Sequence, residues 1–220
     1  MNIVSLASWP PRIQYVEACV NSLLHQTVVP DIIELNLSIP EFPNKEDDLP
    51  EGLRKLIVDG KLSVNWEDAN TYCFRKEIPV VKRHIGEDYN LFSVDDDCLY
   101  APTYIETMLR HLADHDAYNP EPGVVGNRGV TKSRVFNEDF YLKLNQDVID
   151  AGISDTWLAV WLQKVGADCS WGVGKKEIDP LVSENNGASS KTPNSERIGG
   201  YTRDRQMLAW NLSVKALSTN

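Results

Sequence analysis

Residues 90–109, "NLFSVDDDCLYAPTYIETML", join an apolar run to three consecutive aspartates and then to an amphipathic segment. The run at 90–94 predicts a buried strand, and the apolar spacing within 101–115 predicts a helix. The aspartates at 95–97 lie between the two. Like charges at this position repel one another and lose hydration if they are partly buried. Either a bound cation or a solvated loop must therefore relieve the cost.

The segments before this stretch alternate between strand and helix patterns. Apolar runs followed by turn residues predict strands at 2–7, 32–38 and 61–66. Helices are predicted by apolar spacing and by proline placement at 13–26, 53–58 and 79–85. This order predicts an α/β protein with a mostly parallel sheet flanked by helices.

The pattern changes after Asn119. Short apolar runs predict two further strands, at 123–129 and 135–144. A strong helix is predicted at 154–166, where Gly166 provides a stop signal. Residues 175–202 are rich in Ser, Asn, Gly and Pro, a composition that predicts a mobile loop.

Composition limits the class of protein. A chain of 220 residues with 42% hydrophobic residues can bury one substantial core. The net charge of −10 argues against a nucleic-acid partner, because phosphate backbones require a basic footprint. The sequence has neither a signal-peptide pattern nor an apolar stretch of about 20 residues, so we expect no transmembrane segment and a cytoplasmic location.

The three aspartates are predicted at the carboxyl end of a parallel strand, where open α/β sheets bind ligands. Carboxylate oxygens at such a place suit a hard cation, Mg²⁺ or Mn²⁺, whose open positions can be filled by substrate phosphates. The alternative is a helix-entry turn, where acidic residues are favoured by the positive end of the next helix.

Four segments carry a resemblance to a known family: "VSLASWPPRI", "VNSLLHQTVVPDIIELNLS", "EDANTYCFRKEIPV" and "NLFSVDDDCLYAP". In this order they resemble nucleotide-sugar glycosyltransferases of the GT-A fold, similar to family 2. The resemblance implies a Rossmann-like sheet flanked by helices with a small C-terminal acceptor-side region. It also implies a single domain over 1–220, with a nucleotide-sugar-binding half at 1–118 and an acceptor-side half at 119–220.

The resemblance assigns roles to the aspartates. In such enzymes an aspartate motif at the end of a central strand holds a divalent metal that bridges the donor diphosphate. By analogy Asp97 is a direct ligand of Mn²⁺ or Mg²⁺. Asp95 contacts the metal and the ribose or sugar, and Asp96 assists in donor binding.

Residues that bind the donor are implied in three loops. Arg75 and Lys76 occupy the place of a donor-binding basic residue, and Asp68 resembles a donor-contacting acid. Ser8 and Arg12 resemble residues that line the nucleotide pocket. The basic pair could equally be solvated surface residues, and Arg12 could be a surface residue in the first turn of a helix.

Asp155, in "GISDTWLAVWL", resembles the acid that opens a helix beneath the acceptor site of inverting members. It would act as the general base that accepts the proton of the acceptor hydroxyl. The alternative is an acid that merely favours a helix N-terminus. The sequence departs from the family pattern here, since Ser154 stands where many relatives carry a second acid.

The expected activity is thus a metal-dependent, inverting hexosyl transfer from a nucleotide-diphosphate sugar to a glycan, lipid-linked or protein acceptor, in surface glycan or glycoconjugate synthesis. Two alternatives stay open. A Mg²⁺-dependent nucleotidyltransferase would normally carry a Gly-rich basic loop after the first strand, where this chain has "ASWPPR". A non-catalytic nucleotide- or sugar-binding module is also compatible with the single acid at Asp155 and with the lack of a late histidine, a common further metal ligand.

Overall fold

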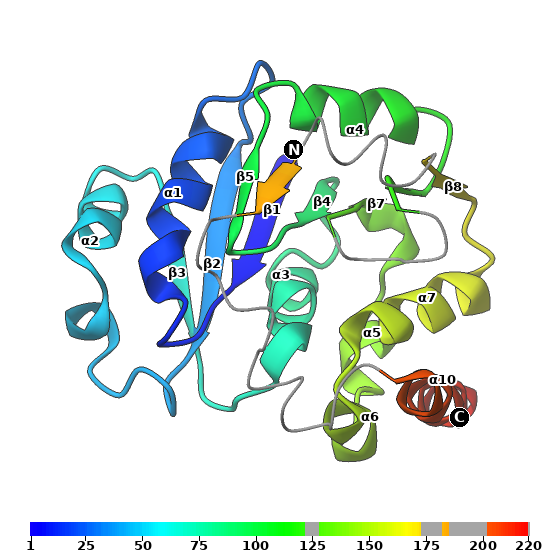
Figure 1. Ribbon diagram of the computed structural model, residues 1–220. Coiled ribbons are helices and arrows are strands. Elements are labelled where there is room, and N and C mark those ends of the chain that lie inside the picture. Colours follow the sequence, from blue (N-terminus) through cyan, green and yellow to red (C-terminus); the bar gives the residue numbers. More distant parts are fainter. Residues whose placement is uncertain (122–127, 173–181, 185–201, 220) are drawn as a thin grey trace.

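The computed structural model describes residues 1–121, 128–172, 182–184 and 202–219 (Figure 1). A seven-stranded sheet with the order β3-β2-β1-β4-β7-β6-β8 forms its centre, and β5 and β9 form a separate pair. The strands are β1 (Asn2–Ala7), β2 (Ile32–Ser38), β3 (Ser63–Glu67), β4 (Asn90–Ser93), β5 (Cys98–Tyr100), β6 (Ala117–Asn119), β7 (Val130–Lys132), β8 (Cys169–Trp171) and β9 (Val182–Glu184).

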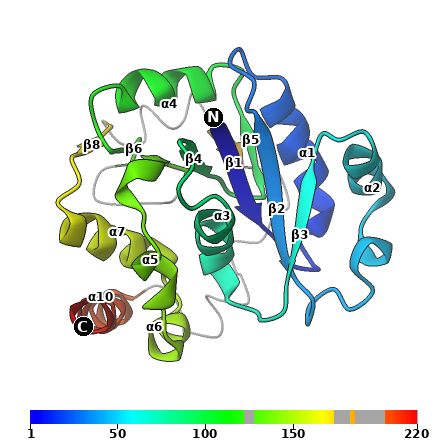
Figure 2. The ribbon, with the colours of Figure 1, turned by 180° about the vertical axis from the view of Figure 1, so that it is seen from behind.

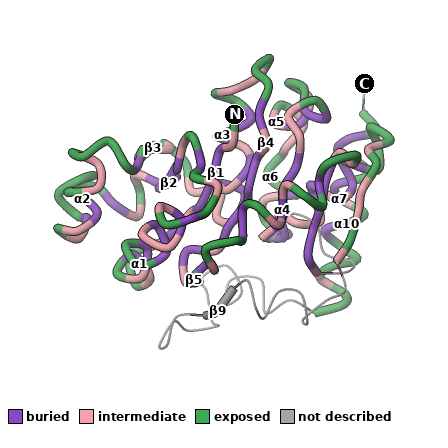
Figure 3. The backbone as a smooth tube through the Cα atoms, turned by 90° about the horizontal axis from the view of Figure 1, so that it is seen from above, coloured by how far each residue is buried: buried purple, intermediate pink, exposed green. Residues whose placement is uncertain are grey.

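Helices cover both faces of the sheet. The α-helices are α1 (Ile13–Leu24), α2 (Glu51–Val58), α3 (Ile78–Arg83), α4 (Tyr104–Leu112), α5 (Asp139–Leu142), α6 (Gln146–Ala151), α7 (Ser154–Val165) and α10 (Arg203–Ser218). Three short 3₁₀ helices are η1 (Lys45–Asp48), η2 (Tyr72–Lys76) and η3 (Ser133–Val135). Figure 3 shows the buried central strands between these two layers.

Alternation along the strands builds two cores. In β1, Val4 points into a core formed with α1, α2 and α4, whereas Ile3 points into a core formed with α3, α5, α6, α7 and α10. Figure 2 shows the second face, with α3 over the centre of the sheet. Because both faces are covered, the inner strands are apolar over most of their length.

The strand pairing is parallel on one side of the sheet and mixed on the other. Strand β1 runs parallel to both β2 and β4, and β2 runs parallel to β3. Strand β7 then pairs antiparallel with β4 and β6, and β8 is parallel to β6. The helices that follow, α1 after β1 and α4 after β4 and β5, pack on the same core. The strand order reverses between β1 and β4, so the carboxyl ends of these two strands form the topological switch point of the sheet.

The expectation of a mostly parallel sheet flanked by helices is confirmed, but the strand predicted at 135–144 is wrong. This segment forms the end of η3 and the short helix α5. Phe136 and Phe140 are four residues apart and pack together with their ring centroids 4.8 Å apart. Phe140 also contacts Trp157 and Trp161 on α7. Phe136 has an extended backbone just after η3, and Phe140 lies in α5, so both rings are buried in the same core.

Other predictions fall partly outside the described residues. Of the strand predicted at 123–129, only residues 128 and 129 are among the described residues. The strand β7 begins after them, at Val130. Most of the loop predicted at 175–202 lies outside the described residues, while β9 within it pairs with β5. The division at 118/119 stays a prediction, and a single sheet takes strands from both sides of it. None of the helices in the described part combines the length and apolar character required to span a bilayer.

Candidate active site

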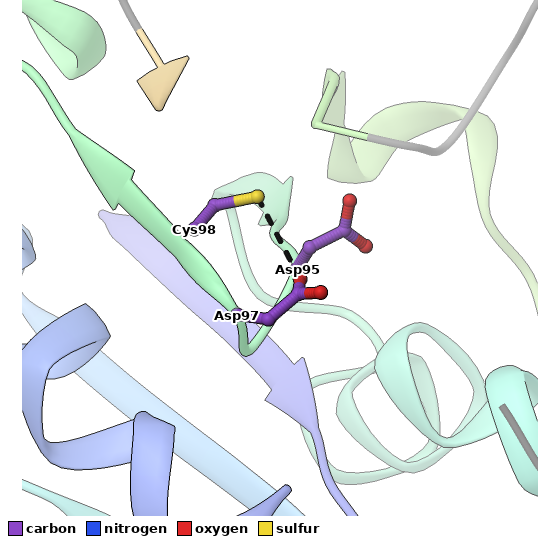
Figure 4. A group of neighbouring side chains, drawn as sticks. All are labelled: Asp95, Asp97 and Cys98. Atoms are coloured by element: carbon purple, nitrogen blue, oxygen red, sulfur yellow. Dashed lines mark hydrogen bonds between the residues drawn. The ribbon is translucent and has the colours of Figure 1, made fainter. Parts of the chain in front are cut away.

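The three aspartates form the turn between β4 and β5, at the carboxyl edge of the sheet. The turn is anchored through its backbone, because the Asp95 N–H donates to the hydroxyl of Tyr100 at 2.8 Å. Figure 4 shows Asp95, Asp97 and Cys98 gathered on this turn. The strand ends where the sequence changes from apolar to charged, as expected from the run at 90–94.

Two of these carboxylates fit a metal ion. One ligand atom each from Asp95, Asp97 and Cys98 lies within 4.8 Å of the others. The Cys98 thiol donates to Asp97 Oδ1 at 3.7 Å, and burial raises the pKa of Cys98 to about 12. A thiol that keeps its proton is a poor ligand, since metals bind the thiolate. The remaining donor set is two carboxylates, which suits Mg²⁺ or Mn²⁺.

Asp96 serves a different purpose from its neighbours. It is 4% exposed and accepts a hydrogen bond from Ser8 Oγ at 2.6 Å. Arg12 forms ion pairs with both Asp96 and Asp97, the latter at 2.7 Å. Burial raises the pKa of Asp96 to about 6, against the effects of Arg12 and Ser8. These contacts join the aspartate turn to the turn between β1 and α1, so Ser8, Arg12 and Asp96 lie together as one anchored unit.

Two cations flank Asp95. Lys76 Nζ forms an ion pair with Asp95 Oδ1, and Arg128 Nε lies 3.3 Å from Asp95 Oδ2. Burial alone would raise the pKa of Asp95, but the charges of Lys76 and Arg128 lower it below its ordinary value. Arg128 was missed in the sequence, where an arginine before a glycine gives no signal of its own.

Arg75 points elsewhere than Lys76. It is 3% exposed, forms an ion pair with Glu41 at 2.7 Å and donates to the carbonyl oxygen of Ser8 at 3.2 Å. Its guanidinium thus braces the loop after β2 against the end of β1. Asp68 is exposed in the turn after β3, and within the described residues it makes no hydrogen bond or ion pair. The structure does not bring Asp68 into the aspartate cluster.

Asp155 lies in the first turn of α7. Burial raises the pKa of Asp155 to about 6. The negative charge of Asp95 acts in the same direction, whereas the positive charges of Lys76 and Arg128 lower the pKa. Asp155 is therefore within electrostatic range of Lys76, Asp95 and Arg128. No hydrogen bond or ion pair joins Asp155 to another described residue.

Glu77 is an acid that the sequence analysis did not single out. It is 3% exposed, and burial raises its pKa to about 8, against the charge of Lys76. A hydrogen bond donated by the Ser93 hydroxyl, at the end of β4, to the Glu77 carboxylate opposes the same rise. Glu77 is therefore largely protonated at neutral pH and adds little negative charge below the aspartate turn.

Several solved structures that match this arrangement of elements are glycosyltransferases. A fragment of S. aureus TarS in complex with UDP-GlcNAc matches 94% of this chain, with a TM-score of 0.57 and 11% identity. The mannosyltransferase PcManGT from Pyrobaculum calidifontis, in complex with GDP-Man and Mn²⁺, matches 99%, with a TM-score of 0.55 and 12% identity. This chain has the GT-A fold. The predicted fold is thus confirmed.

The GT-A fold is recognised here through structure alone. No family model matches the sequence, and a search of curated proteins gave no match. The same TarS fragment in complex with UDP matches 77% of this chain with a TM-score of 0.50 and 12% identity. The chain spans 57% of that fragment and 72% of the mannosyltransferase chain. Identities this low support the GT-A architecture and leave the activity to be argued from the site.

Proposed function

We propose that this chain is a metal-dependent, inverting glycosyltransferase that moves a sugar from a nucleoside-diphosphate donor to a hydroxyl acceptor. The observation that carries this proposal is the pairing of Asp95 with Asp97 at the carboxyl end of β4, within reach of Lys76 and Arg128. Acids that can bind a cation lie beside basic residues that can bind phosphate. An anionic donor held through a metal ion requires both.

The structural neighbours support this class of donor. The TarS structures contain UDP or UDP-GlcNAc, and PcManGT contains GDP-Man with Mn²⁺. UDP- and GDP-linked sugars are therefore the first donors to test. We propose Ser8 and Arg12 as residues lining the nucleotide pocket. Arg75 would act there by bracing the pocket wall, whereas Asp68 has the weakest support among the predicted donor contacts.

In the proposed reaction Asp95 and Asp97 hold Mn²⁺ or Mg²⁺. When bound, such an ion stabilises the negative charge that develops on the leaving diphosphate. Lys76 contributes a fixed positive charge at the same place. Burial alone would lower the pKa of Lys76, but the charges of Asp95 and Asp155 raise it above its ordinary value. Lys76 is therefore cationic at any working pH and stabilises the same charge.

Asp155 is the proposed general base. With a pKa of about 6 it is mostly ionised at neutral pH, yet it is more basic than an ordinary aspartate. This combination favours proton transfer from an acceptor hydroxyl during attack. A base on the side opposite the leaving diphosphate gives inversion at the sugar carbon. The acceptor would be a hydroxyl of a glycan, lipid-linked or protein substrate, in the synthesis of surface glycans or glycoconjugates.

The test is a donor screen with and without metal. UDP-GlcNAc, GDP-Man and related donors are incubated with the chain in Mn²⁺ or in chelator, and released UDP or GDP is measured. Asp97→Asn should leave the melting temperature nearly unchanged, because Arg12 keeps its ion pair with Asp96. It should abolish the Mn²⁺-dependent release of nucleotide. Asp114→Asn, an exposed aspartate after α4, is the matched control and should behave as the unchanged chain.

The same screen separates the alternatives. Donor binding that depends on Mn²⁺, without release of nucleotide or transfer to any acceptor, would indicate a non-catalytic binding module. Release of pyrophosphate from a nucleoside triphosphate and a sugar phosphate would indicate a nucleotidyltransferase. If Asp97→Asn retained full Mn²⁺-dependent nucleotide release, the proposed metal site would be refuted.

A further inference from the structure

Arg12 and Arg128 lie on opposite flanks of strand β4, which pairs with β1 along one edge and with β7 along the other. Arg128 lies two residues before β7, which pairs antiparallel with β4, so the beginning of β7 adjoins the carboxyl end of β4. Phe92 on β4 faces Val130 on β7 in this register. Arg12 enters from the turn after β1, on the other flank of β4. The two arginines therefore lie on either side of the aspartates.

The backbone around Arg128 is fixed. Its φ of 58° lies in the left-handed region, which non-glycine residues rarely adopt. Its carbonyl oxygen accepts a hydrogen bond from the Tyr104 hydroxyl at 2.8 Å. Gly129 packs so closely that an added Cβ would lie 2.9 Å from Asn119 Nδ2. Strain of this kind persists only where the surroundings enforce it, and it occurs frequently at ligand sites.

The guanidinium of Arg128 lies beside Asp95 and is partly exposed. Its side chain is 18% exposed, and Nε is 3.3 Å from Asp95 Oδ2. The geometry is that of an ion pair only, since the buried Nε has no hydrogen-bond partner among the described residues. Asp95 already receives a hydrogen bond from Lys76. A second cation beside one carboxylate, with its Nε unsatisfied among the described residues, has capacity for an additional anion.

The charges of the cluster lead to the same conclusion. Asp95, Asp96 and Asp97 are paired with Arg12, Lys76 and Arg128, and Asp155 adds one further negative charge that acts on Lys76. A divalent ion on Asp95 and Asp97 would make the net charge of this partly buried site positive. An anion is then needed to balance it, and a diphosphate supplies one.

We propose, on the basis of the proposed function, that Arg128 binds the diphosphate of the donor from the β7 side and neutralises Asp95 when no donor is present. Base and ribose would lie toward β1, where Ser8 and Arg12 are. Arg128, on the far flank of β4, reaches the part of the nucleotide that leads to the sugar. It therefore contributes to diphosphate affinity and not to recognition of the nucleoside.

The test compares diphosphate with monophosphate binding by calorimetry in Mn²⁺, using whichever of UDP and GDP binds the unchanged chain and the corresponding UMP or GMP. Arg128→Gln should weaken the diphosphate about ten- to a hundredfold, the scale of a charge-assisted hydrogen-bond pair. The monophosphate should change by about threefold or less. Arg128→Lys retains the charge but not the planar fork of the guanidinium. Its affinity for the diphosphate should lie between that of the unchanged chain and that of Arg128→Gln.

A second measurement titrates Mn²⁺ alone. Arg128→Gln should bind Mn²⁺ more tightly than the unchanged chain, because a cation that competes for Asp95 has been removed. Weaker diphosphate binding together with tighter metal binding cannot result from unfolding, which would weaken both. Arg134→Gln is the matched control, since Arg134 is 63% exposed and pairs with Asp116 at 2.5 Å, away from the aspartates. It should leave both affinities unchanged.

The outcomes separate this inference from the proposed function. If the unchanged chain binds neither UDP nor GDP in Mn²⁺, the proposed function is refuted and the role of Arg128 is refuted with it. If the unchanged chain binds a diphosphate and Arg128→Gln binds it equally well, only the role of Arg128 is refuted. An equal loss for diphosphate and monophosphate would likewise overturn it, because the contact would not be specific to the diphosphate.

Discussion

Asp155→Asn should greatly slow sugar transfer while making the protein more stable. Loss of a general base typically lowers turnover by about two to four orders of magnitude. Donor affinity should be unchanged, because the proposed donor contacts come from the turns after β1 and β4, from η2 and from the residues just before β7, and do not include Asp155. The substitution is nearly isosteric, so the helix α7 should begin at the same place.

The gain in stability follows from the pKa. Burial raises the pKa of Asp155 from 3.8 to about 6. This difference means that the ionised side chain costs about 3 kcal/mol in the folded state at neutral pH. A favourable interaction with the start of α7 offsets about 0.3–1 kcal/mol when the charge is lost. Asp155→Asn should therefore stabilise the fold by about 2 kcal/mol, a rise of about 4–8 °C in melting temperature.

The pH dependence has a definite sign. Between pH 3.8 and about 6 the folded protein holds a proton on Asp155 that the unfolded chain has lost. The contribution of Asp155 to stability therefore falls as the pH rises through this window, and is lowest above it. The variant and the unchanged chain should have similar melting temperatures near pH 4, and the variant should have the higher melting temperature at pH 7.

The assay measures melting temperature, donor affinity and transfer rate on the same variant. Asp147→Asn is a matched control, because Asp147 is an exposed acid in the first turn of α6. It should lose about 0.3–1 kcal/mol of stability and keep its transfer rate. If Asp155→Asn behaved in the same way, Asp155 would be a helix-terminal acid, and the inverting assignment would lose its support.

Two further predictions concern the scaffold. His84 contacts Glu34 and Glu87 at 3.0 Å each; burial alone would lower its pKa, but hydrogen bonds to these acids raise it. Its stabilising effect is therefore complete below the unfolded pKa of 6.5 and lost as the pH rises through the folded value, so His84→Gln should cost about 1–2 kcal/mol near pH 6 and much less at pH 9. Equal losses in thermal melts at both pH values would contradict this. Gly129→Ala should cost about 1–3 kcal/mol, because its Cβ would lie 2.9 Å from Asn119 Nδ2. A melting temperature equal to that of the unchanged chain would show that Asn119 can move aside.

The sequence predicted the part of the fold in which local pattern and tertiary structure agree. The apolar run at 90–94 followed by three acids gave both the strand and the edge at which it ends. The segment at 135–144 failed because its apolar residues suit either period when read alone. Only the contact of Phe140 with Trp157 and Trp161 selects the helix. That contact joins α5 to α7, two helices separated in the sequence, so the spacing of apolar residues within 135–144 does not predict it.

The site divides in the same way. Asp95 and Asp97 were found because consecutive acids after a strand are a local signal. Arg75 and Lys76 are adjacent in sequence, yet one braces Glu41 and the other pairs with Asp95, a difference set by the turn of η2. Arg128 gave no signal, because its importance comes only from the pairing of β7 with β4.

The ring of Arg12, Lys76 and Arg128 also bears on how fast a donor can arrive. The chain as a whole carries a charge of −10, so at long range it repels an anionic nucleotide sugar. Close to these three cations, Asp95, Asp96 and Asp97 already form ion pairs, so the repulsion of the donor weakens near the site. Salt screens the long-range part first, over a Debye length of about 10 Å at 0.1 M. Donor capture should accordingly become faster as ionic strength rises from very low values, the reverse of the behaviour of an enzyme that draws its substrate in by overall charge.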